Sequence, residues 1–175
     1  YLVHILRAHD DFLPELDFVA THGAEIAGNI LYSRSRVEDV PTVTFGPLSV
    51  LPVYQRRGAG SALVRHTLAL CRELGHRAVV MYGDPAYYAR FGFRPAEAFD
   101  ICTADNMYAA ALLAIELYPD ALRGVHGRFY ESPAFEVDVY AAEAFDKGFP
   151  RRAKRETPTQ RAFQQLAAMR RPRAR

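Results

Sequence analysis

The chain has 175 residues, of which 50% are hydrophobic and 24% charged, as in an ordinary globular protein of one domain. No apolar run approaches the ~20 residues of a membrane helix, and the start does not resemble a secretory signal, so we expect a cytoplasmic protein without membrane contact. The two cysteines, Cys71 and Cys102, are too few for a disulfide framework and fit reduced thiols.

The charge is unevenly distributed along the chain. Residues 151–175 hold nine Lys or Arg against one acid, Glu156, whereas residues 1–150 carry 13 bases and 19 acids. We therefore expect one domain over 1–150 and a basic C-terminal extension over 151–175. Such a tail suits an acidic or phosphate-bearing partner, but its single aromatic residue, Phe163, and its lack of a nucleic-acid module argue against nucleic acid. The first residue is Tyr1 rather than methionine, which leaves room for a missing strand or helix upstream.

The first elements are expected to be a helix, a hairpin and a strand. Residues 2–9 space their apolar side chains as the last turns of a helix do. Residues 16–21 and 25–36 are strand-like and flank a His-Gly turn, which predicts a β-hairpin. Residues 42–51 predict a third strand, in which Pro47 requires a bulge or an unpaired position because proline donates no ladder hydrogen bond.

A helix and a strand follow in the middle of the chain. Residues 59–74 predict a helix that ends at Gly75, and residues 78–82 are short, apolar and β-branched like a buried parallel strand. These segments predict a mixed α/β sheet with one right-handed strand–helix–strand crossover over 43–82. The other expected elements are a helical turn at 85–91, strands within 92–102, 108–117 and 135–140, and helices at 142–147 and 160–169.

The segment VLPVYQRRGAGS, residues 50–61, joins the third strand to the long helix through Gly58 and Gly60. Glycine inside a helix costs ~1 kcal/mol relative to alanine, so glycines at this place call for a reason. The free N–H groups and dipole of a helix start suit a phosphate, and glycine lets the anion approach the backbone closely. A plain turn with solvated arginines is the alternative, since the segment is neither a Walker loop nor a three-glycine dinucleotide motif.

Two motifs resemble those of a known family. Gln55-Arg56-Arg57-Gly58-Ala59-Gly60 resembles the Q/R-x-x-G-x-G/A acyl-coenzyme A motif of the GNAT superfamily of N-acetyltransferases, and Tyr88-Ala89-Arg90-Phe91-Gly92-Phe93 resembles the family's second signature. The stretches GDPAYYARFGFRPA and FPRRAKRETPTQRAF are similar to the bacterial YhbS-like branch of predicted acetyltransferases. The resemblance covers roughly residues 2–160. It implies a mostly antiparallel central sheet that is splayed between two parallel strands and flanked by helices.

The resemblance implies acetyl-coenzyme A (acetyl-CoA) as co-substrate and no metal. The pantetheine arm would lie in the gap between the parallel strands 43–51 and 78–82, and the pyrophosphate would lie on the N–H groups at the helix start. The implied cofactor-binding residues are Leu48, Ser49, Val50, Gln55, Arg56, Arg57, Gly58, Ala59, Gly60 and Ser61.

The implied reaction is direct attack of a primary amine on the thioester in a ternary complex. A backbone N–H near Val50 would stabilise the oxyanion. Tyr88 would protonate the leaving thiolate, since the pKa of a tyrosine, ~10, is not far above that of a thiol, ~8.5. Tyr87 is expected to be structural, and Asp84 is expected either to cap the short helix or to contact substrate.

The sequence assigns no general base. Some relatives carry a glutamate eleven residues before the motif glutamine, where this chain has Thr44, which cannot serve. The remaining candidates, none of them favoured, are Glu25, Glu38, Asp39, His22 and His126.

The acceptor stays open between a small-molecule amine and a protein amine, and the assembly between monomer and homodimer. Four aromatic residues are candidates for the acceptor pocket, although such residues are more often core: Tyr108, Tyr118, Phe129 and Tyr130. The competing function is a non-catalytic protein that binds coenzyme A, or one that binds partners through its basic tail.

Overall fold

The computed structural model describes residues 1–151 and 157–173. Its long elements lie in the first half of the chain, and short strands and turns make up much of the second. In chain order the helices and strands are α1 (Leu2–Arg7), β1 (Phe12–His22), β2 (Glu25–Val37), β3 (Val40–Val50), α2 (Ala59–Glu73), β4 (Ala78–Tyr82), α3 (Pro85–Tyr88), β5 (Arg94–Pro95), β6 (Ile101–Cys102), β7 (Met107–Ala109), β8 (Leu112–Glu116), β9 (Gly127–Tyr130), α4 (Val139–Asp146), α5 (Pro158–Ala168) and β10 (Arg170–Pro172).

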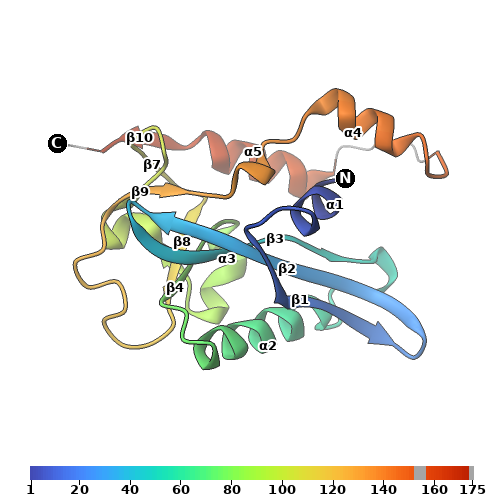
Figure 1. The fold of residues 1–175 in the computed structure, drawn as a ribbon, viewed down its shortest axis with the longest axis horizontal. Helices are drawn as coiled ribbons and strands as arrows, with labels where there is room; N and C mark the ends of the chain where they lie inside the picture. Colours follow the sequence, from blue (N-terminus) through green and yellow to red (C-terminus); the bar gives the residue numbers. More distant parts are fainter. Residues whose placement is uncertain (152–156, 174–175) are drawn as a thin grey trace.

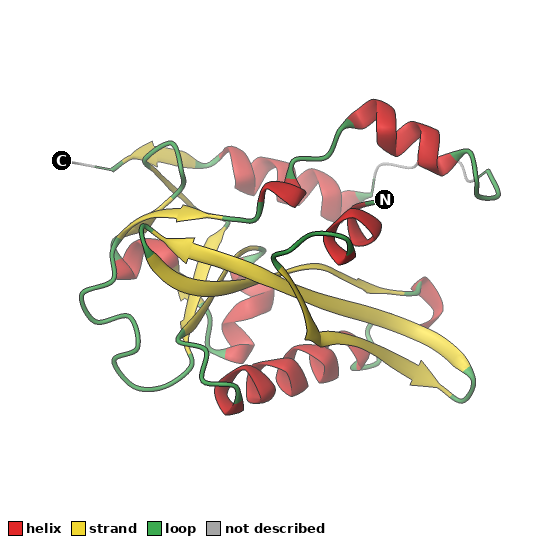
Figure 2. Cartoon of the chain, in the orientation of Figure 1, coloured by secondary structure: helices red, strands yellow, loops and turns green. Residues whose placement is uncertain are grey.

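One curled sheet organises the molecule. Its strands follow the order β5-β8-β4-β3-β2-β9-β6, with β1 paired to β2, and β10 and β7 form a separate ribbon. The pairs β3–β4 and β6–β9 are parallel, and the others are antiparallel. Figures 1 and 2 show α2 below the sheet and α1, α4 and α5 above it. The expected α/β class, with a mostly antiparallel sheet and flanking helices, is confirmed.

The predicted hairpin and the predicted bulge are both present. Strands β1 and β2 pair across the turn at His22 and Glu25. Between β2 and β3, Ile30 pairs with Leu48 and Tyr32 pairs with Phe45, so Gly46 and Pro47 together face a single residue of β2. The bulge accommodates the proline where a regular ladder would need its missing donor.

The parallel pair opens into a fork. Val43 of β3 pairs with Val79 of β4, which confirms the predicted parallel strands. Beyond that point β3 continues beside β2, while β4 continues beside β8 as far as Tyr82 and Leu112. The bulge therefore lies where the two strands separate.

Helix α2 is fixed to one face of the fork by its apolar side. Leu63, Val64 and Leu68 are buried against Tyr32 and Phe45 of the sheet. Thr67, which is also buried, shares a 2.9 Å hydrogen bond with the Tyr32 hydroxyl, so the polar atom of that core tyrosine is satisfied. This packing holds the start of α2 at the end of β3.

The second half of the sheet is more broken than the sequence predicts. The strand expected within 92–102 is split into β5 and β6 by a 3₁₀ turn at Ala96–Phe99, and the strand expected within 108–117 is split into β7 and β8. Strand β9 is not predicted by the sequence analysis, and its residues pair with the end of β2 at Arg36 and Val37.

Residues 135–140 form no strand in the structure, so the prediction of a strand there is wrong. A 3₁₀ turn at Pro133–Phe135 precedes a helix instead. The Asp138 carboxylate accepts hydrogen bonds from the N–H of Tyr140 at 2.8 Å and of Ala141 at 3.2 Å, which caps the start of α4. Capping overrides the apolar alternation, and the helix expected at 142–147 is confirmed with an earlier start.

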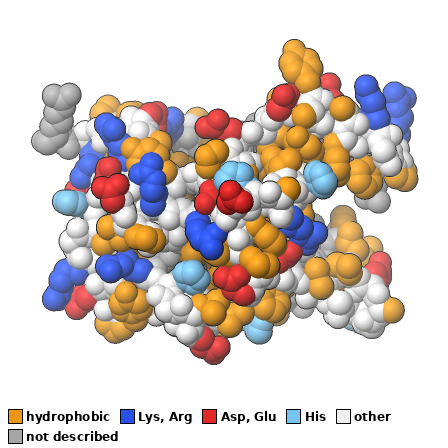
Figure 3. Space-filling model, viewed as in Figure 1, with side chains coloured by type: hydrophobic (Ala, Val, Ile, Leu, Met, Phe, Trp, Pro, Cys, Tyr) orange, Lys and Arg blue, Asp and Glu red, His pale blue; other side chains and the backbone are white. Residues whose placement is uncertain are grey.

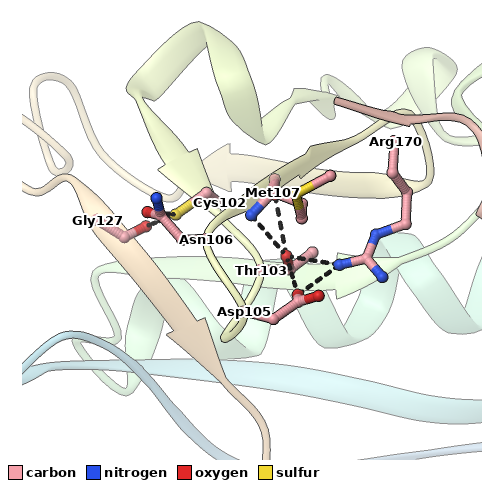
Figure 4. Close-up of polar contacts among 7 residues, drawn as sticks. All are labelled: Cys102, Thr103, Asp105, Asn106, Met107, Gly127 and Arg170. Carbon is pink, nitrogen blue, oxygen red and sulfur yellow. Dashed lines mark hydrogen bonds and ion pairs between the residues drawn. The ribbon is translucent and has the colours of Figure 1, made fainter. Parts of the chain in front are cut away.

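The C-terminal segment folds back onto the body. Thr157 and Gln160 form a capping box at the start of α5. Strand β10 then pairs with β7, with Arg170 opposite Ala109. In Figure 4 the Arg170 guanidinium reaches both the Thr103 hydroxyl and the Asp105 carboxylate.

Two further arginines of this segment engage acids of the body. Arg171 pairs with Glu97, and Arg173 donates to both carboxylate oxygens of Asp100, at 2.8 and 2.5 Å. The Arg173 guanidinium, followed by the Tyr108 hydroxyl, holds the pKa of Asp100 well below its usual range. Figure 3 shows basic and acidic side chains intermixed on the face viewed. These contacts describe a docked strand; Arg152, Lys154, Arg155 and Arg175 lie outside the described residues.

We expect a chain ending at Ala168 to unfold about 3–6 °C below the full chain, because it loses the β10 ladder and three partly exposed ion pairs worth up to ~1 kcal/mol each. The difference should shrink at ~1 M salt, which screens exposed pairs. Thermal unfolding at both salt levels measures it, and equal midpoints for the two chains would show that β10 adds no stability.

Candidate active site

Three elements converge at the fork. The last residues of β3 lead through a 3₁₀ turn at Pro52–Tyr54 into the glycine loop, the loop leads into α2, and α3 follows β4. Leu48 packs on the core that α2 covers, and Ser49 is exposed and donates to the Asn29 side-chain oxygen at 2.5 Å. Among the described residues, no strand pairs with the β4-facing edge of β3 beyond Val43. That edge has backbone hydrogen bonds to offer a ligand.

The glycine loop has a left-handed conformation at two positions. Arg56 has φ +61° and Gly58 has φ +94°, and Gly58 is the N-cap of α2. No side chain of the described residues caps this helix start. The N–H groups of the first turn, which include those of Gly60 and Ser61, therefore keep their capacity to bind an anion.

Gly60 lies at a point of close approach. A Cβ atom placed on it would lie 3.3 Å from the Tyr87 hydroxyl and 3.4 Å from Cγ2 of Val50. Gln55 fastens the other end of the loop, because its side-chain amide donates to the Val50 carbonyl at 3.0 Å. The end of β3, the loop and α3 thus meet around Gly60, while the side chains of Arg56 and Arg57 are exposed.

Tyr88 lies at the inner side of the fork. Its ring packs against Phe45 of β3 and against Phe93, with ring centroids 5.8 and 5.7 Å apart. Burial, followed by the neighbouring Tyr87 and Asp84, raises the pKa of the Tyr88 hydroxyl well above its ordinary value. The raised pKa keeps the hydroxyl neutral, but it also makes Tyr88 a weaker acid than an exposed tyrosine, so the gap to the pKa of a thiol is wider than the sequence alone suggests.

Gly83 is a site residue that the sequence analysis missed. A Cβ atom on it would lie 2.5 Å from Cε2 of Tyr88 and 2.9 Å from the Met81 methyl group. Only glycine leaves room for the Tyr88 ring at the end of β4. The Gly-Asp-Pro sequence at 83–85 signals a turn, but nothing in it signals this contact.

The other two α3 residues singled out from the sequence are also placed. Asp84 is the N-cap of α3 and accepts from the Ala86 N–H at 2.8 Å, so its expected capping role is confirmed. Tyr87 packs edge-to-face on Tyr88, with ring centroids 4.9 Å apart, and its hydroxyl lies beside Gly60. Tyr87 therefore lies against Tyr88 and beside the glycine loop at once.

A pocket of about 1020 Å³ opens beside the fork. Val43 and Tyr82, from the two strands of the fork, line it, as do residues of β9 and of the turn that follows. Three of the four aromatic residues named as acceptor candidates line this pocket, namely Tyr118, Phe129 and Tyr130. Tyr108 does not, because its hydroxyl is bonded to Asp100 under the C-terminal strand.

The base candidates from the sequence are scattered. At the hairpin tip the Glu25 carboxylate accepts from the Tyr54 hydroxyl at 2.6 Å, and His22 packs on the Tyr54 ring. Glu38 accepts from the Arg128 N–H at 2.6 Å. Asp39 lines the pocket, whereas His126 is exposed outside it. Thr44 is fully buried.

Comparison with known proteins identifies the family. The model of the acetyltransferase (GNAT) domain matches residues 15–95. The N-acetyltransferase YhbS of Escherichia coli is 39% identical over 129 residues, which cover 72% of this chain and 76% of YhbS. The chain belongs to the GNAT family of N-acetyltransferases. The resemblance read from its two motifs is thus confirmed, and GNAT membership places the protein among the acyltransferases.

Two solved GNAT structures share the fold at substantial identity. YhbS from Escherichia coli, in complex with CoA, superposes with a TM-score of 0.71 at 35% identity and covers 78% of this chain and 76% of its own. A GNAT acetyltransferase from Brucella melitensis, in complex with acetyl-CoA, superposes with a TM-score of 0.61 at 31% identity, covering 77% of this chain and 76% of its own. Both bind the coenzyme that the motif implies.

Within residues 1–151 and 157–173, no three side chains of His, Cys, Asp or Glu gather as metal ligands would. None of the helices described there has the length and apolarity of a membrane crossing.

Proposed function

We propose that this GNAT protein transfers the acetyl group of acetyl-CoA to a primary amine by direct attack in a ternary complex. The observation that carries the proposal is the convergence of the free edge of β3, the glycine-capped start of α2 and Tyr88 on one fork. The complexes of two relatives with CoA and acetyl-CoA support this choice of co-substrate.

The residues of the fork fit the parts of acetyl-CoA. The backbone of Leu48, Ser49 and Val50 would pair with the pantetheine amides along the free edge. The N–H groups of the 55–61 loop would hold the pyrophosphate, helped by the dipole of α2. Because Gly58 and Gly60 have no Cβ atom, a phosphate can approach the backbone closely at these two positions.

The chemistry asks two things of the protein. The thioester supplies an activated acetyl group, and its carbonyl oxygen gains charge as the amine nitrogen attacks. A backbone N–H near Val50 would stabilise that charge. Tyr88 would give its proton to the sulfur as the C–S bond breaks, since its ring packs on Phe45 beside the bulge. Its raised pKa keeps the proton on the hydroxyl but makes the phenol a weaker acid than an exposed tyrosine.

Titration calorimetry with acetyl-CoA, followed by thiol release with a panel of primary amines, tests the proposal. We expect micromolar binding, roughly −8 kcal/mol, and release of free CoA only when an amine is present. Binding without release from any amine would favour the competing function, a non-catalytic protein that binds the coenzyme. No binding at all would overturn the proposal.

Gly58→Ala should weaken acetyl-CoA binding about tenfold, because alanine at φ +94° costs ~1–2 kcal/mol and moves the N–H groups of the loop. Gly124→Ala is the matched control, since Gly124 has φ +74° and, like Gly58, open space around it. Both variants should lose similar stability, but only the first should lose affinity in the calorimeter. Equal affinities would remove Gly58 from the phosphate site.

A further inference from the structure

An acidic side chain without a partner lines the pocket. Glu131 follows β9 directly and is partly buried. Among the described residues, none forms a hydrogen bond or an ion pair with its carboxylate. Its oxygens are not among the buried unpaired polar atoms, so water can reach them, and an unpaired carboxylate that faces a pocket is available to a ligand that enters there.

The pocket reaches the β3 bulge, which lies next to the residue on which Tyr88 packs. Phe135 belongs to the pocket wall, and its ring lies 3.4 Å from where a Cβ of Gly46 would be. Gly46 is part of the β3 bulge, where the two strands of the fork separate. In Figure 1, α2 lies below the sheet and the segment from β9 to α4, which supplies Phe135, lies above it.

Hydroxyl groups lead from the pocket toward the bulge. Ser35 and Thr42 line the pocket and share a 2.8 Å hydrogen bond across β2 and β3. The next cross-strand pair, Ser33 and Thr44, is buried, and neither hydroxyl has a partner among the described residues. Buried hydroxyls seldom stay unpaired, so these two offer hydrogen bonds to a water molecule or to the acceptor itself.

The surroundings of Glu131 raise the pKa of its carboxyl group. Burial raises the pKa of its carboxyl to about 7, and burial together with the nearby Glu131 raises the pKa of Tyr82 to about 12. The three arginines that line the pocket donate hydrogen bonds to backbone carbonyls: Arg34 to Asp10, Arg36 to Glu38 and Arg77 to Ala121. The other titratable groups on its walls are Asp11, Asp39, His76, Tyr118, Tyr130 and Glu136.

We propose that Glu131 is the proton acceptor for the acceptor amine, which enters through this pocket; the inference rests on the acetyl transfer proposed above. One proton of the arriving ammonium passes to the Glu131 carboxylate and on to solvent. The nitrogen lone pair forms the N–C bond, the C–S bond breaks, and the sulfur takes the Tyr88 proton. The remaining excess proton on nitrogen returns to Tyr88 through water.

The pocket also indicates the class of acceptor. Aromatic rings make up much of its wall, from Tyr82, Tyr118, Phe129, Tyr130 and Phe135. Such rings favour both an apolar body and an ammonium group over their faces. We therefore take a primary amine with an aromatic group as the acceptor class, and benzylamine as the probe.

The test is the pH dependence of kcat for CoA release from acetyl-CoA and benzylamine, both saturating. In the wild type, kcat should rise to a plateau above pH ~7, because the carboxylate form is the active one. Glu131→Gln should lower kcat about 100-fold and abolish the rise, with acetyl-CoA affinity changed less than ~2-fold. Glu131→Asp should keep the rise at reduced kcat. Glu143→Gln, the same change at an exposed residue of α4, should match the wild type.

The outcomes separate the two proposals. A wild type that binds acetyl-CoA but releases no CoA with benzylamine or with any other amine overturns the proposed transfer and this inference with it. A Glu131→Gln variant with wild-type kcat, or with the rise intact, overturns the inference alone and points to another pocket group such as His76. Loss of acetyl-CoA affinity in Glu131→Gln would show a structural role and also overturn it.

Discussion

Tyr88→Phe is expected to lower kcat for CoA release by about 100-fold while changing the acetyl-CoA dissociation constant by less than ~3-fold. Proton donation to a leaving group typically contributes a factor of ~10²–10⁴. The ring, by contrast, is held by packing on Phe45, Phe93 and Gly83, all of which phenylalanine would keep. The change therefore removes the proton and leaves the shape of the fork intact. Steady-state kinetics and calorimetry on the same samples measure both quantities.

Two further variants locate the effect. Tyr140→Phe removes a hydroxyl from an exposed residue of α4 and should not change kcat. Tyr87→Phe removes the hydroxyl beside Gly60 and should act on acetyl-CoA affinity rather than on kcat. Because the pKa of Tyr88 is raised, the wild type should lose no activity from its ionisation up to pH ~10. Unchanged kcat in Tyr88→Phe would exclude Tyr88 as the proton donor.

The parts of the fold that the sequence predicts are those with short-range signals. The turn at His22 and Gly23, the proline at 47 and the periodic apolar face of residues 59–74 each constrain the chain locally. These signals predict the hairpin, the bulge and α2, and the resulting fork contains the cofactor motif. Local signals thus predict the frame of this half of the candidate site, and the resemblance to the GNAT family supplies the coenzyme that it is expected to bind.

The acceptor half depends on long-range packing. Strand β9 has four residues and exists because it pairs with Arg36 and Val37, far away in the sequence. Glu131 has no motif around it, and its position beside Tyr82 follows only from that pairing. The wrong strand prediction at 135–140, by contrast, has a local cause, because the Asp138 cap outweighs the apolar alternation of those residues.

Gly60→Val is expected to weaken acetyl-CoA binding at least 100-fold, which corresponds to about 2.7 kcal/mol. A Cβ at this position already lies 3.3 Å from the Tyr87 hydroxyl and 3.4 Å from Val50. The valine methyl groups would extend further into the space where the pyrophosphate is expected to approach the backbone. The Tyr87 hydroxyl would have to give way by a few tenths of an ångström for the Cβ atom alone, and the methyl groups beyond it would take the room that the ligand needs.

The matched control for this change is Ala62→Val, an exposed position in the first turns of the same helix. It imposes the helix cost of a β-branched residue, ~0.5 kcal/mol, without adding atoms near Val50 or Tyr87. If Gly60→Val loses acetyl-CoA in the calorimeter while Ala62→Val retains it, at similar unfolding midpoints, steric blockage of the loop is the cause. If both variants bind like the wild type, the coenzyme does not lie on residues 55–61. The assignment of Tyr88 as the proton donor would then fail as well, because it depends on a coenzyme that enters along that loop.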